Sequence, residues 1–435
     1  MTTSAHTARP PAQTRPLFPV GRMYALVVFI YVAYPLIGYL AIGGDYEPSN
    51  DNRLWAIQPS LSTVLRLTGW GAAHLVAFIV TYALLAGRRG VRPPPTAPRS
   101  TGAGIIAAYG ALMVFFLALG RFYDLSASDY TESYLVPSRL PLFLAQLYVH
   151  LSGLRLTLKL ALVLWLFIHY RKYRLWLWTW LAVESLLTVA RLGSRTEMVL
   201  LLLAALMLYH AYVRRLPRAL ILAAGLVGFV GFTVLGALRS GVRLEETENL
   251  FAHASECESI FANAVDLEQR IAGGEVSPLP VAFYLQDLFA LVPQQILPVQ
   301  KMDAGRWYVD TYYRTYADNG GAFAFGTIPL ALLGGGLPDV VLRGIAVGAV
   351  FAGIHRWCGR RTLRFWPALF YLWLVVLCYQ SFRSTTFHLV VLFEYRILPA
   401  ILLVTVLSRA MGALLPGRGP APDTAFVPNG TPACP

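Results

Sequence analysis

Long apolar runs recur along this chain and limit its possible folds more than any other feature. A transmembrane helix needs about 20 apolar residues, and this chain is 56% hydrophobic but only 14% charged. One soluble core could not bury so many long apolar segments. We therefore predict an all-α polytopic membrane protein with about ten transmembrane helices. The predicted spans are residues 22–42, 63–86, 104–122, 151–169, 175–190, 197–213, 219–238, 326–355, 365–381 and 388–411.

The loops between these runs alternate in charge, which predicts the orientation of the chain. One set of short loops is basic and contains no Asp or Glu. Positive residues in short loops favour the cytoplasmic side of a membrane. These loops and both termini are therefore predicted to be cytoplasmic, and topology explains the net charge of +13 without a nucleic-acid partner. The basic residues are Arg88, Arg89, Arg92, Arg99, Arg171, Lys172, Arg174, Arg214, Arg215, Arg218, Arg356, Arg360, Arg361 and Arg364.

The same pattern divides the chain into tails, spans and one large insertion. The predicted order is a cytoplasmic tail at 1–21, seven spans within 22–238, a periplasmic insertion at 239–325, three spans within 326–411, and a disordered cytoplasmic tail at 412–435. Within the insertion, residues 244–271 carry apolar positions at helical spacing, which predicts an amphipathic helix lying over the membrane. Residues 285–316 are rich in proline and aromatics, which indicates either an interfacial belt or a platform for sugar rings.

Several arginines lie at the predicted outer ends of spans, against the positive-inside rule. An arginine at the bilayer centre costs about 2.5–3.5 kcal/mol, so such charges usually face water or a partner. Guanidinium groups bind phosphate oxygens in pairs. We therefore predict a site for a phosphate or pyrophosphate group, although each arginine could instead reach lipid phosphate alone. The candidate binding residues are Arg191, Arg195, Arg239, Arg243 and Arg383.

A second group of charges falls inside the predicted spans. Arg155 and Lys159 are four residues apart and so share a helix face. Glu184 and the pair Glu394 and Arg396 are similarly embedded. Intramembrane charges form either an ion-pair network or a substrate pathway, and the sequence leaves both possibilities open.

A general base is sought among acids and histidines near the predicted outer face. The candidates for a catalytic role are His253, Glu197 and Asp310. Any of them could take a proton from a sugar hydroxyl. The acids of the insertion form no D-x-D motif, and the chain has no P-loop and no C-x-x-C. No metal and no cofactor are therefore predicted.

Three segments resemble the oligosaccharide repeat-unit polymerases of bacterial surface polysaccharide synthesis, the Wzy-type O-antigen polymerases. Gly193-Ser194-Arg195 is similar to the family's glycine–arginine turn, residues 291–301 resemble its P-x4-P-x-x-K segment ending at Lys301, and residues 320–338 resemble its glycine-rich entry to the next span. Where relatives often carry an acid in that entry, this chain has Gly326-Thr327-Ile328-Pro329.

The resemblance implies a GT-C-like fold and a glycosyltransferase of the bacterial inner membrane that joins repeat units carried on undecaprenyl pyrophosphate. It implies that the arginines, with Lys301, hold the pyrophosphate, that an acid or histidine assists the acceptor, and that a chain-length regulator is a possible partner in exopolysaccharide or lipopolysaccharide synthesis. An O-antigen ligase would use the same donor, whereas a flippase should show repeated halves and a cationic cavity through the full depth. The stretch at residues 342–346 resembles membrane acyltransferases, but it falls in a different span from theirs.

Overall fold

A computed structural model describes residues 15–42, 59–123, 139–190, 195–217, 256–276, 304–318, 323–386 and 388–414, with isolated positions at 219–225 and 296. All regular elements in these ranges are helices. Six helices are long and apolar enough to cross a membrane, so the chain is a multi-pass membrane protein. They are α1 (Val20–Ile42), α3 (Leu61–Leu85), α4 (Arg99–Phe122), α6 (Leu142–Ile168), α15 (Gly336–Gly359) and the continuous segment α18–η4–α19 (His388–Leu392, Phe393–Ile397, Leu398–Leu414).

Two shorter apolar helices, α8 (Arg195–Tyr212) and α16 (Phe365–Leu377), also match predicted spans. Residues 170–174, predicted as a basic loop, are instead the first turns of α7 (Tyr170–Ala190). No proline or glycine follows His169, so the helix resumes at once, with a kink at Tyr173. Most of the span predicted at 219–238 lies outside the described residues, as does most of each predicted tail.

The span predicted at 326–355 is not one helix. It consists of α14 (Thr327–Leu332), a turn, and α15. The turn contains Gly334 and Gly335, and Gly336 follows with φ +63°, a conformation that glycine adopts without strain. The glycine-rich entry therefore breaks the span into a short and a long helix.

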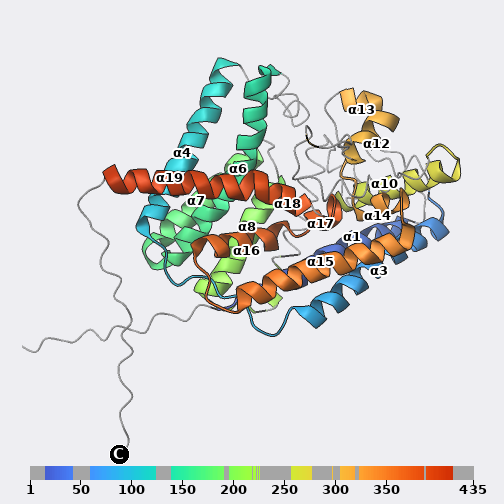
Figure 1. The fold of residues 1–435 in the computed structure, drawn as a ribbon, viewed down its shortest axis with the longest axis horizontal. Helices are drawn as coiled ribbons and strands as arrows, with labels where there is room; N and C mark the ends of the chain where they lie inside the picture. Colours follow the sequence, from blue (N-terminus) through green and yellow to red (C-terminus); the bar gives the residue numbers. More distant parts are fainter. Residues whose placement is uncertain are drawn as a thin grey trace, which may run out of the picture.

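The helix α15 packs closely along α3 (Figure 1). A Cβ on Gly344 would lie 2.6 Å from the carbonyl oxygen of His74, and one on Gly348 would lie 3.0 Å from that of Phe78. Glycines four residues apart let two membrane helices approach backbone to backbone. Together with α1, which contacts both, these helices form one part of the bundle.

A second part of the bundle surrounds α6, which contacts α4, α7, α8, α16, η4 and α19. All residues at positions 156–167 of α6 are buried. A helix that is buried on all sides is typical of the centre of a bundle. Any charge on this stretch must therefore find its partners on the surrounding helices.

The two classes of predicted loop lie at opposite ends of the bundle. At one end the N-terminal segment and two basic loops are joined by backbone hydrogen bonds. Leu17 N donates to Val91 O at 2.7 Å, and Leu363 N donates to Arg92 O at 3.2 Å. At the other end Arg66, near the start of α3, forms an ion pair with Glu268 of α10 (Glu256–Ala272). The assignment of the basic end to the cytoplasm stays a prediction.

The described part of the insertion comprises α10, α12 (Ala304–Tyr312) and α13 (Arg314–Asp318). The predicted amphipathic helix is confirmed over α10, whose Phe261, Ala264 and Leu267 are buried. The sequence predicted that this helix lies over the membrane. In the structure α10 packs instead on α1 and α14 of the bundle. A small core around Leu267 and Tyr308 joins α10 to α12.

Candidate functional site

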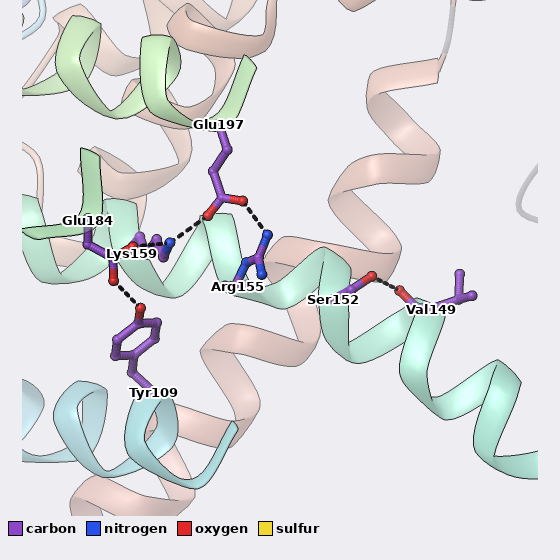
Figure 2. A network of polar contacts seen from close by, with 7 residues as sticks. All are labelled: Tyr109, Val149, Ser152, Arg155, Lys159, Glu184 and Glu197. Carbon is purple, nitrogen blue, oxygen red and sulfur yellow. Dashed lines mark hydrogen bonds and ion pairs between the residues drawn. The ribbon is translucent and has the colours of Figure 1, made fainter. Parts of the chain in front are cut away.

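A chain of ion pairs and hydrogen bonds links α4, α6, α7 and α8 inside the bundle (Figure 2). Lys159 Nζ lies 2.5 Å from Glu184 Oε2 and 2.8 Å from Glu197 Oε1. Arg155 Nη2 donates to Glu197 Oε2 at 2.7 Å. The hydroxyl of Tyr109 donates to the other oxygen of Glu184. We call these five residues the charged network.

The charged network is electrically balanced and mostly buried. Its two cations, Arg155 and Lys159, face two carboxylates, Glu184 and Glu197. The Lys159 side chain is 5% exposed and that of Glu197 is 11% exposed, whereas that of Arg155 is 39% exposed. Buried charges in a membrane need partners, and here each has one. Arg155 therefore has the most exposed side chain of these three and lies at the edge of the network.

Local structure explains how the network is positioned. Arg155 and Lys159 are one turn apart on α6, so their side chains leave the same face. Glu197 lies in the first turn of α8, where the helix dipole favours a negative charge. Its two contacts with α6 fix the start of α8 against the centre of the bundle.

A π-helical turn, η4, lies beside the same region of α6. Arg396 in this turn faces Gly153, since a Cβ there would lie 3.3 Å from the Arg396 Nε. Glu197 interacts electrostatically with Arg396, although no described carboxylate lies within ion-pair distance of this guanidinium. In the same turn, Glu394 Oε2 is buried without a hydrogen-bond partner among the described residues. Single π-helical turns within α-helices frequently occur at functional sites.

The structure brings one of the predicted catalytic residues, Glu197, into this network. Asp310 lies instead on α12, where it forms an exposed ion pair with Arg306 at 2.9 Å. Arg383 ends the short helix α17 (Gln380–Arg383). Arg195 begins α8, but its side chain lies outside the described residues, as do His253, Arg191, Arg239, Arg243 and Lys301.

A second polar cluster lies on the insertion, around Asp266. Its carboxylate accepts hydrogen bonds from Tyr308, from Tyr313 at 2.9 Å and from Arg270 at 3.1 Å. Burial raises the pKa of Tyr308, and the hydrogen bond to Asp266 raises it further. Arg270 also lies over the Tyr312 ring, 4.3 Å from its centroid. Asp266 thus joins α10 to α12 and to Tyr313, the residue between α12 and α13.

Two residues of these polar clusters, Tyr109 and Asp266, were not among the residues predicted from the sequence. Tyr109 is one of many aromatics in apolar spans, and nothing nearby in the sequence marks it as a partner of Glu184. Asp266 is four residues before Arg270 on an amphipathic helix, a spacing that predicts their ion pair. Within the described ranges, no three His, Cys, Asp or Glu side chains converge as metal ligands.

Chemically, the edge of the charged network offers Arg155, held in place by Glu197, and Arg396 lies against Gly153 on the same helix. Such an arrangement can bind a phosphate or pyrophosphate group. No family model, curated protein or solved structure matches this chain. Function is therefore inferred from the site itself.

Proposed function

We propose that this protein is a polysaccharide polymerase that joins undecaprenyl-pyrophosphate-linked repeat units at the periplasmic face. The observation that best supports this function is Arg155, whose side chain is 39% exposed and is held by Glu197 at the edge of a buried network. It lies two residues after Gly153, which Arg396 faces. A fixed guanidinium in a membrane-embedded site favours a phosphorylated lipid over a neutral substrate. The proposal includes a GT-C-like fold with about ten spans.

The reaction is an inverting, metal-independent glycosyl transfer. The hydroxyl oxygen of the acceptor sugar attacks the anomeric carbon of the donor, and the bond from that carbon to the pyrophosphate oxygen breaks. The hydroxyl proton passes to a base, for which His253 and Asp310 are the candidates on the insertion. Undecaprenyl pyrophosphate leaves with its negative charge met by arginines, so electrostatic stabilisation carries much of the rate.

In this mechanism Glu197 is a positioning residue. Its carboxylate already contacts Arg155 and Lys159, so it orients the guanidinium. Arg155 and Arg396, with the arginines predicted at outer span ends, meet the charge that develops on the leaving group.

The test is polymerisation of purified lipid-linked repeat units by the full chain in proteoliposomes, read as a product ladder on a gel. Arg155→Lys and Arg396→Lys keep the charge but lose the forked donor geometry. Each should slow polymerisation by about two to three decades, or about 2–4 kcal/mol. The control is Arg215→Lys, an exposed residue in a basic loop, which should polymerise normally.

Three outcomes would contradict the proposal. Full ladders from both the Arg155→Lys and Arg396→Lys variants would show that these two arginines do not bind the pyrophosphate. Transfer of the glycan to a lipid A core, with no ladder, would identify a ligase. Movement of the lipid-linked glycan across the bilayer, with no new glycosidic bond, would identify a flippase.

A further inference from the structure

An apolar cavity of about 200 Å³ lies between α15, α16 and the segment from α17 to η4. We call it the lateral groove. Its walls include Val350 and Phe351 of α15, Trp373 of α16, and Thr386 and Val390 of the third segment. The volume is below the roughly 300–1,000 Å³ of sites that enclose a whole small ligand. The groove therefore fits a portion of a longer, narrow molecule.

The lateral groove opens sideways on the membrane-facing surface. Val350 is 48% exposed and Val390 is 40% exposed, and both belong to helices that can cross the membrane. The inner wall is closed by Trp373 and Phe351, which are buried. A molecule can thus enter from the hydrocarbon layer and exchange lipid contacts for contacts with aromatic rings.

One end of the lateral groove is polar. Thr386 accepts a hydrogen bond from Nη1 of Arg343 at 2.6 Å, and Ser381 lies two residues before Arg383. This end of the groove lies next to α14, because the Thr327 hydroxyl of α14 donates to the Ser381 carbonyl at 3.3 Å. Arg343 also forms an ion pair with Asp339 at 2.9 Å, and neither of these two residues lines the cavity. The groove thus combines an apolar section with the hydroxyl-bearing residues Ser381 and Thr386 at one end.

The lateral groove and the contact of Arg396 with α6 lie on two sides of the same π-helical turn. Phe393 of η4 lines the groove, whereas Arg396 of η4 faces Gly153 on α6. A hydrocarbon chain in the groove would therefore lie about one helical turn from Arg396, one of the arginines assigned to the pyrophosphate. This proximity distinguishes the groove from the other lipid-facing surfaces of the bundle.

We propose that the lateral groove binds the isoprenoid units next to the pyrophosphate of the lipid-linked substrate. The proposal rests on the proposed function for its choice of a polyprenyl chain. A groove between helices fixes the first part of a long flexible chain and so orients the anomeric carbon near the bases of the insertion. The rest of the chain stays in the bilayer.

The test uses the full chain in nanodiscs and a polyprenyl phosphate that carries a diazirine on its first isoprenoid units. Adducts are mapped by mass spectrometry after illumination. We expect adducts within α15, α16 and α18, displaced by undecaprenyl phosphate but not by an equal excess of phosphatidylglycerol. Val350→Trp, which fills the mouth, should reduce the adduct yield by about tenfold. The matched control is Leu342→Trp, at an exposed position of the same helix that does not line the groove.

Adducts confined to other helices, or equal displacement by phosphatidylglycerol, would overturn the proposal. An unchanged yield with Val350→Trp would also overturn it. The proposed function is tested separately. If adducts form in the lateral groove but the protein makes no polymer, the lipid site stands and the polymerase function is wrong. If the protein makes a normal polymer ladder but the adducts lie elsewhere, the polymerase function stands and the lipid site is wrong.

Discussion

Lys159→Met should lower the free energy of unfolding by about 3–5 kcal/mol, because it leaves two buried carboxylates without the cation between them. Lys159 Nζ lies 2.5 Å from Glu184 and 2.8 Å from Glu197. Methionine is nearly as long and also unbranched, so packing changes little. The loss therefore reports on charge balance within the charged network.

A second substitution should restore much of this loss. In Lys159→Met/Glu184→Gln the remaining charges are Arg155 and Glu197, which still form their 2.7 Å pair. Tyr109 can still donate to the amide oxygen at position 184, as it does to the carboxylate. We expect the double variant to regain about 2–3 kcal/mol relative to Lys159→Met, within the range of couplings measured between contacting residues. The control is Asp310→Asn, which breaks an exposed pair and should change stability by less than about 1 kcal/mol.

The measurement is unfolding in mixed micelles with increasing SDS, followed by tryptophan fluorescence and extrapolated to zero SDS. Membrane abundance of each variant is measured in parallel. Wild-type stability in Lys159→Met would mean that these pairs contribute little. A double variant no more stable than Lys159→Met would mean that lost packing, and not unbalanced charge, destabilises the single variant.

The remaining predictions concern topology, metal dependence and the outer arginines. A topology reporter fused after Arg215 should report a cytoplasmic location, and one fused near Glu275 should report a location outside the cytoplasm. The opposite pair of results would mean that the predicted orientation is reversed. Polymerisation should survive EDTA, and a loss restored by magnesium or manganese would reveal a metal site. Arg195→Lys, Arg239→Lys and Arg383→Lys should each shorten the polymer nearly as much as alanine does. Full-length polymer at normal abundance from all three would make these arginines membrane anchors.

The transmembrane helices were the most predictable part of the fold. Residues 22–42, 63–86 and 104–122 correspond to α1, α3 and α4, because a spanning segment must satisfy its backbone internally and so becomes a helix. The break between α14 and α15 was missed, although the glycines that cause it are visible in the sequence. Glycine is common within transmembrane helices, so composition alone does not separate a tolerated glycine from a break.

The site was predictable in its parts but not in its connections. The spacing of Arg155 and Lys159 predicted a shared face, and an internal ion-pair network was one of two possibilities for them. Their partner Glu197 was grouped instead with its sequence neighbours Arg191 and Arg195. The helix that follows Glu197 is apolar on all faces, so its sequence does not show which side turns toward α6.

The position of Glu197 links the two arginine groups that the sequence had separated. Glu197 lies two residues after Arg195, and its carboxylate is held by α6, so the start of α8 is tied to Arg155. Glu184→Gln and Glu197→Gln remove the same charge, but only the second deprives Arg155 of its ion-pair partner. We therefore expect Glu197→Gln to slow polymerisation per folded molecule much more than Glu184→Gln. Equal rates in the proteoliposome assay would show that the network stabilises the bundle without positioning Arg155 for the reaction.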